Sequence, residues 1–95
     1  MRLSQYYIDT IKDKFYEFFQ EGEIYLFGSR VDDSSRGGDI DLYFVLKDHS
    51  NLFNKKIKFL SRVKRVLGEQ KIDVVFNIDK ERLIEQEAIK WGVKL

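Results

Sequence analysis

A nine-residue segment that opens with Asp-x-Asp and continues as an apolar and aromatic run constrains this chain most. Residues 39–47 read DIDLYFVLK, which is rich in the aromatic and β-branched residues that favour strands. Side chains two apart in a strand point to the same face, so Asp39 and Asp41 share one face while Ile40 and Leu42 line the other. The segment therefore predicts a core strand that begins with two neighbouring carboxylates.

Two carboxylates at the start of a core strand repel each other unless a cation lies between them. A third acid, Asp73, lies in residues 71–77 (KIDVVFN), on the face opposite to Ile72 and Val74. If this strand pairs beside residues 39–47, three carboxylates converge on one patch. Ligands that are all oxygen favour Mg²⁺ or Mn²⁺ over zinc, and three carboxylates suit two metal ions that clamp a phosphate during in-line displacement. The alternatives are a solvated strand edge with ordinary surface carboxylates and an intact but inactive site.

Apolar periodicity and capping residues predict the rest of the fold. Ser4 and Asp79 are the expected N-caps of the first and last helices, and the three helices are expected to end at glycines, namely Gly22, Gly68 and Gly92. We expect helices over 4–20, 51–67 and 79–90, strands over 23–28, 39–47 and 71–77, and a loop over 29–38. The order α-β-β-α-β-α indicates one α/β (α+β) domain, residues 1–95, in which helices pack on a small sheet.

Composition excludes several classes of site. The chain has 95 residues, 17 basic and 16 acidic, with a net charge of +1. Such a balance argues against a dedicated nucleic-acid coat. The absence of cysteine excludes disulfides, thiolate metal sites and thiol catalysis, and the single histidine excludes histidine-rich metal sites. No apolar run is long enough to span a bilayer or to act as a signal peptide, so we expect a cytoplasmic protein without membrane contact.

Gly28 and Ser29 follow the expected strand 23–28 and form a candidate phosphate-binding turn. Glycine allows the backbone to approach a bulky anion closely, and Ser29 offers a hydroxyl and an N–H group. The pair is followed after nine residues by Asp39-x-Asp41. By itself Gly-Ser is also an ordinary loop opener, so a plain turn is the alternative.

The run LFGSRVDDSSRGGDIDLYFV, followed by KIDVVF, resembles the polymerase-β-type nucleotidyltransferase superfamily. Its short length is similar to that of the minimal nucleotidyltransferases, the antitoxin partners of HEPN-domain ribonuclease toxins. The resemblance implies the nucleotidyltransferase fold with its small mixed sheet. It also implies that Asp39 and Asp41 hold two Mg²⁺ ions, for which Mn²⁺ substitutes, and that Asp73 contributes a ligand and orients or deprotonates the attacking hydroxyl.

The same resemblance implies that Gly28 and Ser29 bind the β- and γ-phosphates of the nucleotide, with Arg30 as a further phosphate ligand. The sequence departs from many family members after Gly-Ser, where an Ala-Arg-Gly type of stretch is replaced by Arg30 followed by Val31, Asp32 and Asp33. The two extra acids weaken the expected affinity of this loop for phosphate.

Three functions are compatible with these residues. The first is a Mg²⁺-dependent transfer of a nucleoside monophosphate, AMP from ATP or another nucleoside triphosphate, to a hydroxyl on a partner protein, which by resemblance is a tyrosine of a HEPN toxin. The second is an antitoxin that neutralises its partner by binding alone. The third is a nucleotidyltransferase subunit that acts on a small molecule or nucleic acid, or an accessory domain that binds nucleic acid through the basic residues of 51–67. A solvated helix face also explains that basic segment.

Overall fold

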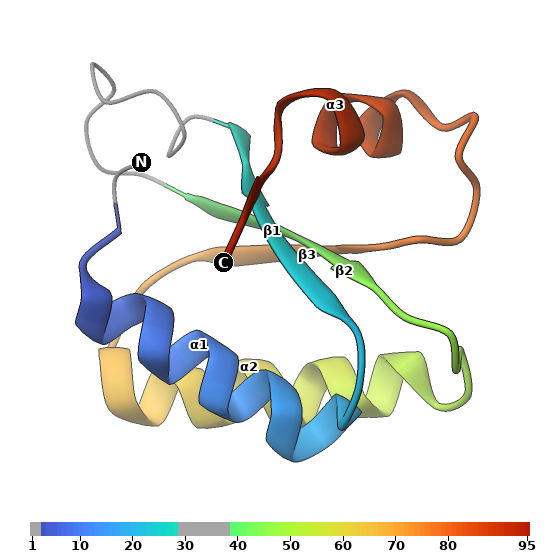
Figure 1. Cartoon of the computed structure of the whole chain (residues 1–95). Coiled ribbons are helices and arrows are strands. Elements are labelled where there is room, and N and C mark those ends of the chain that lie inside the picture. Colours follow the sequence, from blue (N-terminus) through green and yellow to red (C-terminus); the bar gives the residue numbers. More distant parts are fainter. Residues whose placement is uncertain (1–2, 29–38) are drawn as a thin grey trace.

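The computed structural model describes residues 3–28 and 39–95. They form three helices and four strands in the order α1, β1, β2, α2, β3, α3, β4 (Figure 1). The bounds are α1 Gln5–Phe19, β1 Glu23–Phe27, β2 Ile40–Val45, α2 Leu52–Leu67, β3 Ile72–Phe76, α3 Leu83–Trp91 and β4 Val93–Lys94. The expected order of six elements is confirmed, and the two-residue strand β4 is added at its end.

The strands form one mixed sheet in the order β3-β2-β1-β4. β1 runs antiparallel to β2 and to β4, whereas β2 and β3 are parallel. Parallel neighbours need a crossover connection, which α2 provides. The expected pairing of the Asp73 segment beside the Asp41 strand is therefore confirmed, with Asp41 directly opposite Asp73.

The main hydrophobic core lies between the sheet and the two helices α1 and α2, which lie together on one side of it (Figure 1). Phe44 of β2 is fully buried there and makes edge contacts with Phe15 and Phe19 of α1 and with Phe59 of α2, at ring-centroid distances of 4.7 to 5.3 Å. Offset and edge-on geometries are the favourable ones for aromatic pairs. This core fixes which face of β2 points inward.

The opposite face of the sheet carries α3 and a smaller cluster of Phe27, Tyr43 and Ala88 (Figure 1). Helix α3 packs on this face against β1 and β3. No helix in residues 3–28 and 39–95 is long and apolar enough to cross a membrane.

The predicted helix ends are partly wrong. Ser4 caps α1 as expected, since its hydroxyl accepts the N–H of Tyr7 at 3.2 Å. α1 nevertheless ends before Gly22, because Gln20 takes the left-handed conformation that closes the helix. Gly68 and Gly92 do close α2 and α3.

Asp79 is not the N-cap of α3, which begins four residues later than expected, at Leu83. The Asp79 carboxylate accepts the N–H of Glu81, and its carbonyl accepts the N–H of Arg82. These bonds make a tight turn between β3 and α3. A turn and a helix N-terminus use the same side-chain chemistry, which is why the sequence pattern did not separate them.

Candidate active site

The three predicted aspartates lie at one end of two neighbouring strands. Ile40 and Leu42 are fully buried in the main core, so Asp41 between them faces the other side of the sheet, and Asp39 precedes β2 with the same alternation. Asp73 lies opposite Asp41 on β3. The sheet register thus brings the three carboxylates, here called the acid cluster, to one patch on the face that carries α3.

The surroundings of Asp41 disfavour its ionised form. Burial raises the pKa of its carboxyl group, and the negative charges of Asp73, Asp39 and Glu87 raise this pKa further. Glu87 comes from α3 and was not predicted as part of the site. A carboxylate that is both partly buried and surrounded by like charges is destabilised in its ionised form, and a bound cation relieves that destabilisation.

Lys71 is the cation that the structure places beside these acids. Its Nζ atom lies 3.3 Å from Oδ2 of Asp39. The hydrogen bond to Asp39 and the charges of Asp39 and Asp73 raise the pKa of the Lys71 ammonium. The sequence contained this residue two positions before Asp73, but nothing in a lysine at the start of a strand distinguished it from any other surface lysine.

Gly28 fits closely against Asp41. Its φ angle is +76°, and a Cβ atom at this position would overlap Oδ2 of Asp41. Only glycine combines this backbone conformation with the close approach of the neighbouring carboxylate. Gly28 was expected beside a ligand, and the structure adds a second reason for it, namely room for Asp41. Ser29 and Arg30 lie outside the described residues.

The acid cluster has the donor chemistry that a hard divalent cation needs. Its members offer only carboxylate oxygens, and Asp41 is held where like charges crowd it. The described residues contain no group of three or more acidic, histidine or cysteine side chains arranged to hold a metal ion. Asp39 is instead paired with Lys71. The residues therefore fit such an ion by their chemistry, and binding would require Asp39 to exchange its partner.

A further carboxylate near this face, Glu85 of α3, was not predicted from the sequence. It is fully buried and accepts hydrogen bonds from the Tyr43 hydroxyl at 2.8 Å, from Nε of Arg82 at 2.9 Å, and from the backbone N–H groups of Ile78 and Asp79. Arg82 also donates to the carbonyl of Phe76 at 3.0 Å. This network ties the turn after β3 and the start of α3 to the sheet.

The pKa values of Glu85 and Tyr43 in this network shift in opposite directions. Burial opposes ionisation of Glu85, but the hydrogen bonds from Asp79, Tyr43 and Arg82 outweigh it, so that the pKa of Glu85 is lowered. Burial and the bond to Glu85 raise the pKa of Tyr43 to about 12. Tyr43 therefore remains a neutral donor and Glu85 a charged acceptor at neutral pH. The sequence feature that could have indicated this network is Glu85 itself, a glutamate on the side of the last helix that faces the sheet.

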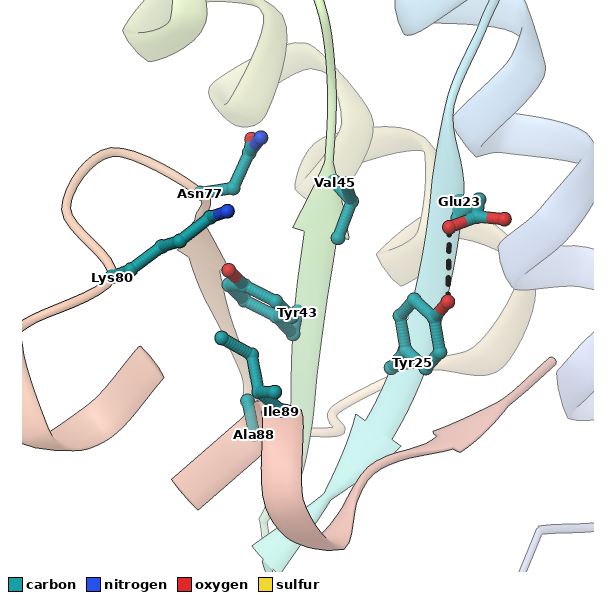
Figure 2. Close-up of a pocket in the computed structure, with 8 residues that line it drawn as sticks. All are labelled: Glu23, Tyr25, Tyr43, Val45, Asn77, Lys80, Ala88 and Ile89. Carbon is teal, nitrogen blue, oxygen red and sulfur yellow. Dashed lines mark hydrogen bonds between the residues drawn. The ribbon is translucent and has the colours of Figure 1, made fainter. Parts of the chain in front are cut away.

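A cavity of about 330 Å³ lies on the same face, at the other end of the strands (Figure 2). Tyr25, Tyr43 and Val45 line its strand side, and Ala88 and Ile89 of α3 line the other. Glu23 accepts a hydrogen bond from the Tyr25 hydroxyl at its edge (Figure 2). In the strand register Val45 pairs with Glu23 while Asp41 pairs with Phe27, so the cavity is separate from the acid cluster.

The basic segment of α2 is partly neutralised. Three of its cations have acidic partners: Arg62 pairs with Glu17 at 3.0 Å, Lys64 with Glu69 at 3.1 Å and Lys55 with Asp48 at 3.8 Å. Helix α2 lies on the face of the sheet opposite to the acid cluster. This placement separates the basic residues from the candidate site.

Comparison with known proteins gives two findings that agree with this geometry. One solved structure, described as a crystal structure of a mutant toxin–antitoxin MntA–HpeT, has a chain that superimposes with a TM-score of 0.68 at 20% identity, covering 93% of this chain and 69% of that one. At this identity the likeness establishes the fold, and it confirms the expected nucleotidyltransferase architecture. Sequence comparison with curated proteins gives no significant match. The family described as polymerase beta, nucleotidyltransferase, matches residues 9–95, which contain the acid cluster, Gly28, every strand, α2, α3 and α1 from Asp9 onward, and the chain therefore belongs to that nucleotidyltransferase family.

Proposed function

We propose that this protein transfers a nucleoside monophosphate, AMP from ATP in the first instance, to a hydroxyl group on a partner protein, and that it needs divalent metal ions to do so. The observation that carries the proposal is the pairing of Asp41 with Asp73 beside Asp39 in a chain of the nucleotidyltransferase family. Carboxylates crowded in this way suit a reaction in which cations neutralise the charge of a triphosphate.

The reaction would exchange one phosphate ester bond for another. The acceptor oxygen would form a bond to the α-phosphorus of ATP, the bond from that phosphorus to the bridging oxygen of the β-phosphate would break, and pyrophosphate would leave. Asp73 would orient the acceptor hydroxyl and receive its proton. Gly28 would let the backbone come close to the phosphates, with Ser29 and Arg30 as further phosphate ligands.

Asp39, Asp41 and Asp73 are the side chains that would hold the metal. Two Mg²⁺ ions, or Mn²⁺ in their place, would supply charge neutralisation at the transferred phosphate and the leaving pyrophosphate. In this arrangement Asp39 and Asp41 serve binding of the metal–nucleotide complex, whereas Asp73 serves the attack itself.

We propose a protein as the acceptor because the sequence resembles the minimal nucleotidyltransferases, which are partners of toxin proteins. The similar solved structure is of a toxin–antitoxin pair, which supports a toxin as the partner. Together with the sequence resemblance to minimal nucleotidyltransferases, this favours a HEPN-domain toxin, modified on a tyrosine hydroxyl and silenced by the modification. The protein would then act as its antitoxin.

Single-turnover labelling with the partner protein tests this proposal. The protein is incubated with Mg²⁺, the candidate partner and each of ATP, GTP, CTP and UTP, and the partner is examined for a mass increase of one nucleotide. Asp73→Asn should leave nucleotide affinity within a few fold and reduce the transfer rate at least about 100-fold, which is the scale for loss of a positioned base. Asp41→Asn should reduce both.

Asp13→Asn serves as the matched control, because Asp13 is an exposed carboxylate on α1, on the other side of the sheet. It should transfer at the wild-type rate. Transfer by Asp73→Asn at the wild-type rate would show that Asp73 is a structural strand residue. Absence of any labelled partner with all four nucleotides would reject the transferase proposal.

A second candidate function is an antitoxin that neutralises its partner by binding alone. The ion pair between Lys71 and Asp39 favours this second function, because Lys71 already neutralises one of the carboxylates that would bind the metal. Such a pair is compatible with a protein that has lost its catalytic activity. The double variant Asp39→Asn, Asp41→Asn separates the two functions. Retained neutralisation of the partner by this variant supports binding alone, whereas loss of neutralisation with retained complex formation supports chemistry.

A further inference from the structure

Lys71 is positioned against the acid cluster by the sheet itself. Its carbonyl accepts the backbone N–H of Ile40 at 3.0 Å, which aligns the start of β3 with the start of β2. This alignment places the Lys71 side chain beside Asp39, where Nζ and Oδ2 lie 3.3 Å apart. The pair therefore follows from main-chain register rather than from a chance encounter of two flexible surface side chains.

Lys71 differs from an ordinary surface lysine in the number of acids that act on it. The negative charges of Asp39, Asp73 and Asp41 all act on its ammonium group. A comparable ion pair on the same sheet, Lys94 with Glu23, has a 3.0 Å separation and similar exposure, with side-chain exposures of 59% and 44% against 68% and 45% for Lys71 and Asp39. In the Lys94 pair Glu23 is the one carboxylate that acts on the ammonium group, and the other attractive contributions come from the hydroxyls of Tyr25 and Tyr16. The two pairs thus differ in surroundings and not in accessibility.

We propose that the Lys71 ammonium is a built-in counter-cation of the acid cluster, which competes with the divalent metal ion for Asp39 and is released when metal and nucleotide bind together. This inference rests on the proposed function, because it assumes that the acid cluster takes a divalent cation. A monovalent cation attached to the chain lowers the repulsion among the three carboxylates without bridging them. The acid cluster without metal is stabilised in this way, and its affinity for metal alone is reduced.

Release of Lys71 has a consequence for the order of binding. Once a divalent cation takes Asp39, the ammonium loses its carboxylate partner, and phosphate oxygens of a bound nucleotide offer a new one. Metal alone therefore displaces Lys71 and leaves its ammonium group without a new partner. Metal together with a triphosphate displaces Lys71 as well, but the phosphate oxygens then pair with the ammonium group. The site should favour the metal–nucleotide complex over the free metal ion.

Titration of the full chain with Mn²⁺ by calorimetry tests the competition. Lys71→Met should bind Mn²⁺ alone about two- to fivefold more tightly than the wild type, which is the range expected for loss of one exposed ion pair. Lys71→Arg keeps the charge and should remain close to wild-type affinity. Lys94→Met, the matched control, should change the affinity by much less than twofold. In 0.5 M salt the advantage of Lys71→Met should shrink, because exposed charges are screened.

A second titration, in the presence of a non-hydrolysable ATP analogue, tests the release. The gain in Mn²⁺ affinity of Lys71→Met should disappear or reverse, because the variant cannot give an ammonium to the phosphates. Thermal unfolding without metal provides a readout that is independent of binding. Lys71→Met should melt at a lower temperature than the wild type, and added Mn²⁺ should restore more of the difference than it does for Lys94→Met.

The outcomes separate this inference from the proposed function. Wild-type binding of Mn²⁺ combined with equal or weaker binding by Lys71→Met overturns the counter-cation role and leaves the transferase proposal intact. An equal gain for Lys94→Met assigns the effect to net charge and also overturns it. If neither the wild type nor Lys71→Met binds Mn²⁺, with or without the nucleotide, both the inference and the metal-dependent function are rejected. An undiminished gain in the presence of nucleotide overturns the release step.

Discussion

Asp41 and Glu85 are two carboxylates associated with the same face of the sheet, and their surroundings are opposite. Glu85 is fully buried, yet a hydroxyl, a guanidinium and two backbone N–H groups donate to it, and its pKa is lowered. Asp41 is only partly buried, yet its pKa is raised, by that burial and by the charges of Asp73, Asp39 and Glu87. The less buried carboxylate, Asp41, is therefore the one whose ionised form is destabilised.

The balance of donors and like charges, and not burial alone, distinguishes a carboxylate that is stable in its ionised form from one whose ionised form a cation would stabilise. An ionised carboxylate with enough hydrogen-bond donors is stable even without water, because the donors replace its hydration. A carboxylate whose neighbours are other acids retains unfavourable energy that a ligand can remove. The protein holds α3 in place with the first kind and exposes the second kind beside it.

The largest expected effect comes from removal of Glu85. Glu85→Ala removes the acceptor of the buried Tyr43 hydroxyl, of Nε of Arg82 and of two backbone N–H groups, and we expect it to lower the free energy of unfolding by about 3 kcal/mol. Urea denaturation at neutral pH measures this change. Glu85→Gln retains one acceptor oxygen and should lose less. A loss below about 1 kcal/mol in Glu85→Ala would show that the network is incidental and that Glu85 does not differ from a surface acid.

The next effect separates backbone strain from crowding of the acid cluster. Gly28 and Gly68 have nearly equal φ angles, +76° and +79°, but an added Cβ overlaps the Asp41 carboxylate at Gly28 and meets no described atom within 4 Å at Gly68. Alanine at Gly68 should cost at least about 1 kcal/mol of stability, because its φ of +79° with a ψ of −154° is a conformation that residues with a Cβ rarely adopt. Alanine at Gly28 is also strained by its positive φ and adds the overlap with the Asp41 carboxylate. Only Gly28→Ala should displace Asp41 and abolish binding of Mn²⁺ with ATP.

Calorimetric titration and urea denaturation of the two glycine variants check this pair of expectations. Equal binding by both variants would mean that Asp41 moves without consequence. Such a result would remove the acid cluster from the proposed metal site.

Removal of the Asp41 charge should give a smaller effect of opposite sign to that of Glu85. In buffer containing a chelator, Asp41→Asn should raise the free energy of unfolding by a few tenths to about 1 kcal/mol, because the repulsion from Asp73 and Asp39 disappears. Asp13→Asn removes an exposed carboxylate that lies 3.1 Å from a lysine, so it should give no gain. A destabilised Asp41→Asn would contradict the view that Asp41 is strained in the absence of metal.

The pH dependence of these differences is the finest test. The pKa of Asp41 is raised in the folded protein, so its penalty is fully present above that pKa and is relieved as the pH falls through it. The pKa of Glu85 is lowered, so its contribution is fully present above its ordinary value of 4.5 and is lost as the pH falls through the folded-state value. The advantage of Asp41→Asn should therefore shrink when the pH falls from 7 toward 4, whereas the deficit of Glu85→Gln should persist there and shrink only at lower pH.

Urea denaturation of both variants and the wild type, from pH 7 to pH 3, follows these two differences. Parallel curves for the two variants would show that both carboxylates experience the same environment, and the contrast between them would then be wrong.

Several features of this protein were determined by local sequence. The alternation of DIDLYFVLK fixed both the strand and the common face of Asp39 and Asp41, because successive side chains in a strand point to opposite faces. Ser4 capped α1 and Gly68 and Gly92 closed their helices because these effects act within one turn of backbone. The end of α1 at Gln20 and the turn at Asp79 were missed, since more than one local arrangement satisfied the same residues.

Tertiary structure decided how distant residues meet. The register of β3 against β2 placed Asp73 opposite Asp41 and Lys71 beside Asp39, and the packing of α3 brought Glu87 toward the acid cluster and buried Glu85 under Tyr43 and Arg82. Neither hydrophobic periodicity nor helix-capping residues predict these contacts, because each contact joins segments that are separate in the chain. The sequence therefore determined which side chains carry charge and which face of the sheet they share. The fold decided which carboxylates receive hydrogen bonds from donors and which lie beside other negative charges, since only the packed sheet and α3 set the distances between these groups.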